Sequence, residues 1–151
     1  MFDTQHVLKD AGAVTSSGYG TVDAAAQVLD LGSGLVRGNL ILEISRLAMQ
    51  GNDQTYQIHL MGGDDASFSA TASLAVLEIG PKETTQDGKD SKLGRYIVPF
   101  ENQRNGTVYP YVRVRHVLGG TGPVINYVAR LEKDLPVTGT VNSAAATTTT
   151  T

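Results

Sequence analysis

Two neighbouring aspartates, Asp64 and Asp65, have the types and spacing that most directly suggest chemistry in this sequence. A carboxylate pair can hold a calcium ion or serve in acid–base catalysis. A calcium loop needs several more oxygen ligands at fixed intervals, and only two serines lie near. The pair follows Gly-Gly, and Asp and Gly are residues that β-turns select. We therefore predict a turn after a strand, with Phe68 as the anchor that holds the loop against the domain, and no metal site.

Three histidines are the other candidates for metal binding or proton transfer. His59 and His116 are expected at outward positions of strands, and His6 lies near the N-terminus without a visible partner. No H-x-H or H-E-x-x-H spacing occurs, and no carboxylate is placed beside either strand histidine. We interpret both as surface residues.

Other catalytic motifs are also missing from the sequence. The chain has no cysteine, which excludes disulfides, thiolate zinc sites and cysteine nucleophiles. The GSG at 32–34 is too short for a serine elbow. The glycine-rich stretches at 18–20 and 119–122 lack the lysine and the strand-to-helix setting of a phosphate loop. We predict no catalytic residue and no cofactor, and hence no enzyme.

The composition of the chain limits the kinds of partner that the protein is expected to bind. The 151 residues fit one domain, and the net charge is −3 with basic residues scattered along the chain, so nucleic acid is not an expected partner. Apolar runs of only a few residues are too short for a membrane span, and the acidic N-terminus does not resemble a secretory signal. Charged residues make up 18% and glycines number 17, a balance typical of a β-rich domain with many turns.

Short apolar or alternating segments, bounded by turn residues, indicate the strands. They are residues 26–32, 38–49, 55–62, 73–80, 95–100, 109–118 and 123–134. Most predict one buried and one wet face, whereas 73–80 is nearly all apolar and is expected to be covered on both faces. Pro99 marks 95–100 as an edge strand or its end. No segment shows a convincing helical stripe, so the sequence predicts an all-β, two-sheet antiparallel sandwich with jelly-roll or immunoglobulin-like topology.

The domain boundaries follow from the same pattern. We expect an extended N-terminal arm at 1–20, the sandwich at 21–135 and a flexible threonine-rich tail at 136–151. The tail cannot bury enough apolar surface to fold. Within the sandwich, residues 81–94 carry many charges and are expected to form an exposed, mobile loop.

One predicted strand face carries aromatic and arginine side chains at every second position. It contains Tyr109, Tyr111, Arg113 and Arg115. These residue types are enriched at protein interfaces, but they also form cross-strand ladders on open sheet faces, and both interpretations stay open. With Phe100 added from the neighbouring strand, these are the candidate subunit-interface residues.

Six stretches, taken in order between Phe2 and Asp134, resemble the capsid cement (decoration) proteins of tailed bacteriophages, of the jelly-roll kind found on short-tailed phages. They read FDTQHVLKDAGAVTSSG, VLDLGSG, LMGGDDASFS, GRYIVPF, YPYVRVRHVL and VINYVARLEKD. The most specific are the DTQ start, the DLG at a strand end and DDASFS. The charged loop and the threonine tail depart from the family pattern.

The resemblance implies a jelly-roll homotrimer on the outer surface of the virion capsid. It would be made in the host cytoplasm and seated at three-fold and quasi-three-fold positions, where subunits of the major capsid protein meet. The N-terminal arm is then expected to lie on the capsid and to become ordered on binding. Its candidate contact residues are Phe2, Asp3, His6, Val7 and Leu8.

Two other functions are compatible with an all-β sandwich. A carbohydrate-binding module would stack sugars on exposed aromatics, for which Tyr109 and Tyr111 are the candidates in a chain without tryptophan. An enzyme of the cupin kind would hold a metal through histidines and a carboxylate.

Overall fold

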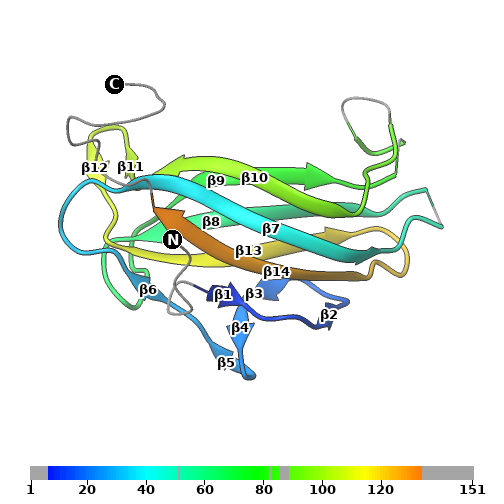
Figure 1. The fold of residues 1–151 in the computed structure, drawn as a ribbon, viewed down its shortest axis with the longest axis horizontal. Helices are drawn as coiled ribbons and strands as arrows, with labels where there is room; N and C mark the ends of the chain where they lie inside the picture. The colour runs from blue at the N-terminus through cyan, green and yellow to red at the C-terminus, as the bar shows by residue number, and fades with distance from the viewer. Residues whose placement is uncertain (1–6, 51, 82, 86–88, 134–151) are drawn as a thin grey trace, which may run out of the picture.

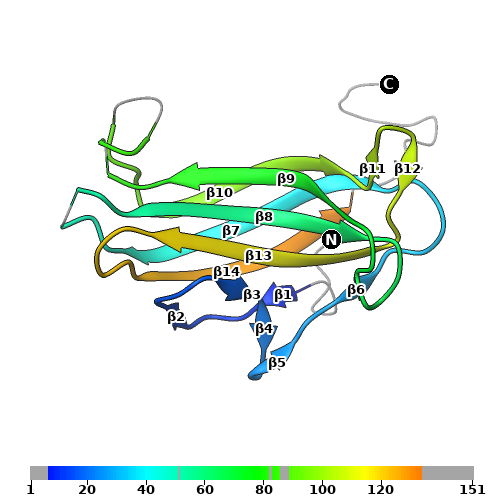
Figure 2. The same cartoon turned by 180° about the vertical axis from the view of Figure 1, so that it is seen from behind.

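The computed structural model describes residues 7–50, 52–81, 83–85 and 89–133. Two antiparallel sheets pack face to face over these residues (Figures 1 and 2). The described residues form no helix. The all-β sandwich predicted from the alternating segments is therefore confirmed. The predicted tail at 136–151, and the arm residues Phe2, Asp3 and His6, lie outside the described residues.

The strands divide between two main sheets and two small hairpins. Sheet A has the order β1 (Val7–Lys9), β14 (Ile125–Lys133), β7 (Arg37–Leu47) and β10 (Gly94–Glu101), with β2 (Ala13–Val14) beside β14. Sheet B has the order β3 (Gly18–Tyr19), β13 (Tyr111–Gly119), β8 (Thr55–Gly63) and β9 (Thr71–Ile79), with β6 (Leu29–Asp30) beside β13. The hairpins are β4 (Thr21–Val22) with β5 (Ala25–Ala26), and β11 (Gln103–Arg104) with β12 (Thr107–Val108).

The strand order is that of a jelly roll. The eight strands that make up the two sheet paths are β1, β3, β7, β8, β9, β10, β13 and β14 in chain order. Counted this way, the first pairs with the eighth, the second with the seventh, the third with the sixth and the fourth with the fifth. A long antiparallel ribbon that folds over on itself gives this pairing, and it places alternate pairs in opposite sheets. The predicted jelly-roll topology is confirmed.

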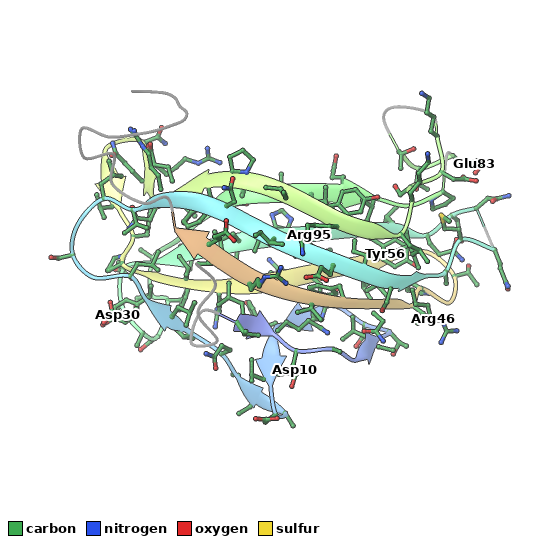
Figure 3. All side chains as sticks on the ribbon, in the orientation of Figure 1. Asp10, Asp30, Arg46, Tyr56, Glu83 and Arg95 are labelled. Atoms are coloured by element: carbon green, nitrogen blue, oxygen red, sulfur yellow. The ribbon has the colours of Figure 1, made fainter. Side chains whose placement is uncertain are left out.

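The core lies between the sheets, where the long strands place their alternating apolar residues (Figure 3). The fully buried members of the long strands, each at most 1% exposed, are Leu40, Leu42, Tyr56, Ile58, Leu60, Val112, Val114, Ile125, Tyr127, Ala129 and Leu131. These are the inward positions predicted from the period-2 pattern. A strand side chain that is buried on one face leaves its neighbours on the other, so the same pattern defines the outer faces of both sheets.

Strands β10 and β9 are edge strands of the two sheets. The structure agrees with the prediction for β10 and differs from the prediction for β9. Strand β10, which contains Pro99, pairs only with β7 among the described residues and is an edge strand as predicted. Strand β9 was expected to be covered on both faces, and this prediction is wrong. Val76 is 47% exposed because it points outward from sheet B, on the same face as its cross-strand partner His59.

The prediction of an extended N-terminal arm is also wrong from Val7 onward. Residues Val7–Lys9 form β1, which pairs with the edge of β14 that β7 leaves open. Leu8 is 0% exposed and belongs to the core, so it is not available for a contact with a capsid. An apolar side chain next to an open strand edge gains both backbone hydrogen bonds and burial by joining the sheet. Further along, the predicted strand at 26–32 is reduced to the two short strands β5 and β6.

The described parts of the predicted loop at 81–94 are attached to the sandwich at several points. The N–H of Ser91 donates to the Gly80 carbonyl, at 2.9 Å, and the Thr84 hydroxyl donates to the Gln54 carbonyl, at 2.8 Å. Pro81 is buried, whereas Leu93 is 56% exposed. The segment is therefore exposed in part, with a base that is fixed to β8 and β9.

Candidate interaction surface

The Asp64-Asp65 loop is a turn that its own carboxylates stabilise. Asp65 Oδ1 accepts the N–H groups of Ser67 and Ser69, at 2.9 and 3.2 Å, and Oδ2 accepts the Ser69 hydroxyl, at 2.9 Å. Asp64 Oδ1 accepts the N–H of Ala70, at 2.9 Å. The hydrogen bonds from Ser69 lower the pKa of Asp65 below its usual range. Both carboxylates are thus engaged in the geometry of the turn.

Phe68 holds this loop against the sheet. Its side chain is only 7% exposed although it lies in a loop, and its backbone φ is +56°. The ring lies directly over Gly63, the last residue of β8, where an added Cβ would be 2.5 Å from a ring carbon. Glycine at this position is what allows the ring to approach the strand so closely.

We expect Gly63→Ala to lower the free energy of unfolding by about 1–3 kcal/mol, because the new methyl group must displace the Phe68 ring. Urea denaturation measures the change. Gly34→Ala is the matched control, since no atom lies within 4 Å of the Cβ it would add, and its effect should stay within about 0.5 kcal/mol. Equal effects of the two substitutions would show that Phe68 does not anchor the loop.

Phe68 and Tyr19 enclose the guanidinium group of Arg113. The guanidinium carbon lies 3.8 Å from the centroid of the Tyr19 ring and 4.1 Å from that of the Phe68 ring. The three residues come from β3, the loop after β8, and β13. We call them the Arg113 clamp. The sequence pointed to Arg113 and Phe68 separately, but nothing in it linked the two residues or indicated Tyr19.

The other candidate interface residues take several positions. Tyr111 is half-buried on β13, and Arg115 is exposed on the same strand. Tyr109 precedes β13 and is half-buried, with its N–H donating to the Asn102 carbonyl at 2.7 Å. Phe100 needs a correction, since it faces the core and is 6% exposed. It follows the inward alternation of β10, and burial excludes it from a subunit contact.

His59 lies on the outer face of sheet B, as expected. Its Nδ1 is 2.9 Å from the Ser73 hydroxyl, and its Nε2 is 3.2 Å from the Gln57 side-chain oxygen. Partial burial lowers the pKa of His59, and the positive charge of Arg115 lowers it further. The ring is a member of a polar cross-strand row on this face.

The prediction that His116 faces solvent is wrong. It is 3% exposed and points into the core, because it is two residues from Val114 and shares its inward alternation. Its Nδ1 lies 2.7 Å from the hydroxyl oxygen of Tyr127 on the opposite sheet. Burial lowers the pKa of His116 to about 4, with a further contribution from the charge of Lys9, and burial raises the pKa of Tyr127.

Lys9 completes this internal polar cluster, and no sequence pattern indicated it. Its side chain is 3% exposed, and its Nζ donates to the carbonyls of Asp10, Gly12 and Tyr127, at 2.8, 3.0 and 2.7 Å. The Nζ also lies 4.4 Å from the centroid of the Tyr127 ring. Burial lowers the pKa of Lys9. Three carbonyls satisfy all the donors of the ammonium group, so the cluster fixes β1 and the turn after it to β14.

The described residues offer neither a cluster of metal ligands nor a membrane-spanning helix. No group of three or more His, Cys, Asp or Glu in this part of the chain is placed to hold a metal ion. It contains no helix that is long and apolar enough to cross a membrane. A groove of about 680 Å³ lies between β9, β10 and the described parts of the charged loop, and both signs of charge line it.

Comparison with protein-family models gives no match, and comparison with curated proteins gives none either.

Proposed function

We propose that this protein is a capsid cement (decoration) protein of a tailed bacteriophage. It would bind as a homotrimer to the outer surface of the mature head, at the three-fold and quasi-three-fold junctions of the major capsid protein. The observation that carries the proposal is the jelly-roll strand order, which is the fold expected from the resemblance of the sequence to that family. Because a fold supports many functions, the proposal rests equally on the ordered motifs of the sequence.

The mechanism is stabilisation by mass action. A protein that binds the mature lattice and not the free capsid subunits shifts the equilibrium towards the intact shell by its binding free energy. A trimer adds avidity, because three weak contacts on one rigid body act at high effective concentration. No step of this mechanism needs a catalytic group.

The residues assigned to this function are fewer than the sequence suggested. Tyr109, Tyr111 and Arg115 remain candidates for contacts between subunits, since each keeps some exposure. Leu8 and Phe100 are removed because both are buried in the core. Within the expected capsid-binding arm, Val7 is half-buried in β1, and the residues before it are outside the described part of the chain.

Light scattering followed by co-sedimentation with expanded phage heads tests the proposal. We expect the molar mass of a trimer, and saturable binding to heads at a fixed ratio of this protein to the major capsid protein. A monomer that stays in the supernatant would contradict the proposal. That outcome would favour the carbohydrate-binding module, and Tyr109→Ala and Tyr111→Ala would then be tested for loss of glycan binding.

A further inference from the structure

The Arg113 clamp holds a cation in a fixed orientation on the outer face of sheet B. Two aromatic rings enclose the guanidinium group, at 3.8 and 4.1 Å from the guanidinium carbon. Phe68 is 7% exposed and immobilised over Gly63, whereas Tyr19 is 44% exposed and forms the solvent-side wall. Arginine stacks on aromatic faces with its N–H groups directed outward in the plane of the group. The clamp therefore restricts Arg113 before any ligand is present.

The donors of Arg113 have no acceptor within the described part of the chain. Its Nε is buried and makes no hydrogen bond, and no ion pair of Arg113 occurs among the described residues. Two other arginines of this part of the structure show the usual arrangement, in which the guanidinium group has an acceptor. Arg37 pairs with Glu101 at 2.8 Å, and Arg104 donates to the Ser73 carbonyl at 2.7 Å. An ordered guanidinium group without an acceptor is unusual, because its N–H groups normally recover the hydrogen bonds that burial removes.

We propose that Arg113 is a preformed anchor for a side-chain carboxylate, an aspartate or glutamate on the surface of a partner protein. A planar guanidinium group binds a carboxylate through two parallel hydrogen bonds. Because the clamp has already ordered Arg113, binding costs less side-chain entropy than binding to a free arginine would. Aromatic and arginine residues in such surroundings dominate the binding energy of protein interfaces.

The acceptor is assigned to another protein for two reasons. The carboxylates of the loop that contains Phe68, Asp64 and Asp65, already accept hydrogen bonds from their own turn. Nucleic acid would need a run of cations to follow its phosphates, and this chain has a net charge of −3 with scattered basic residues. A single cation held between two rings fits one acidic side chain.

The assignment does not depend on the capsid proposal, because a peptide can replace the partner. In the first experiment, a blocked tetraglutamate peptide is titrated into the full chain while the side-chain NMR signals of Arg113 and Tyr19 are recorded. We expect saturable shifts of both, with no shift from a tetraglutamine peptide. Acetate at the same carboxylate concentration tests a free small acid, and phosphate tests a general anion. Equal affinity for phosphate and the peptide would overturn the assignment to a carboxylate, and equal affinity for acetate would overturn the assignment to a partner protein.

Three variants separate the anchor from charge and folding. Arg113→Lys keeps the charge but loses the two parallel donors, and we expect it to weaken peptide binding about tenfold. Arg113→Gln should abolish binding, whereas Arg46→Gln, which removes an exposed arginine from sheet A, should leave it unchanged. Backbone NMR spectra check that each variant is folded. If Arg113→Lys binds the peptide as tightly as the unchanged protein does, Arg113 is not the anchor. The same conclusion follows if Arg46→Gln weakens peptide binding as much as Arg113→Gln does.

Light scattering tests whether the acceptor lies on a second copy of this chain, because Tyr111 and Arg115, the candidates for subunit contacts, flank Arg113 on the same face of β13. We expect the molar mass of Arg113→Gln to equal that of the unchanged protein. A lower mass would show that the carboxylate belongs to another subunit, and the assignment to a partner protein would then be wrong. Failure to bind phage heads, with peptide binding intact, would contradict only the capsid proposal.

Discussion

Replacing Leu8 with alanine is expected to lower the free energy of unfolding by about 2–5 kcal/mol, the range for removing a fully buried leucine side chain. Leu8 is 0% exposed, in a strand of three residues at the edge of sheet A. The truncation leaves a cavity between the sheets and removes the main apolar contact that attaches β1. Urea denaturation of the full chain measures the change.

Leu93→Ala is the matched control for this substitution. Leu93 is 56% exposed, so the same change in side chain should alter the free energy of unfolding by no more than about 0.5 kcal/mol. If Leu8→Ala were as neutral as the control, the N-terminal segment would be a free arm after all, as the sequence first suggested. The result therefore decides whether β1 is part of the folded domain in solution.

The protein is expected to lose about 3 kcal/mol of stability to His116 alone as the pH falls from about 6.5 to about 4. Burial between the sheets, together with the charge of Lys9, lowers the pKa of His116 to about 4. Between the unfolded and folded pKa values, the unfolded chain binds a proton that the folded chain does not. Stability therefore rises with pH across this window, and the full contribution is present above the unfolded pKa.

His116→Gln separates this contribution from the protonation of carboxylates, which also lowers stability in acid. Glutamine retains a polar group near the Tyr127 hydroxyl but does not titrate in this range. We expect the variant to be less stable at pH 7, and its stability to fall less steeply than that of the unchanged protein between pH 6.5 and 4. Urea denaturation at several pH values gives both curves. Parallel curves would mean that His116 is protonated in the folded core, contrary to the expectation.

The internal cluster around Tyr127 explains why a short N-terminal strand is attached so firmly. Lys9 donates to three carbonyls, one of them on β14, and His116 reaches Tyr127 from sheet B. The cluster thus joins β1, β14 and β13. A buried ammonium group with all its donors satisfied is costly to disrupt, because removing it takes a hydrogen-bond donor away from the buried Tyr127 carbonyl.

The residues of the long strands that face the core can be assigned from the amino-acid sequence alone. Side chains alternate along a strand with a period of two, so Leu40 and Leu42, or Val112 and Val114, could be assigned to one face from their spacing. The sequence also indicated the edge position of the strand with Pro99, because proline cannot donate to a sheet. These are local properties, since each depends only on neighbours along the chain. The same rule would have placed His116 inward had it been carried two residues past Val114.

The pairing of strands and the contacts between side chains that are distant in the sequence arise only in the folded domain. Three residues far apart in the sequence, Tyr19, Phe68 and Arg113, form one clamp, and Lys9, His116 and Tyr127 form one buried cluster. No periodic pattern contains these pairings, because they arise when the antiparallel ribbon folds into two facing sheets. Solvent exposure was decided in the same way, since the position of a strand within its sheet leaves Val76 exposed and draws Leu8 into the core.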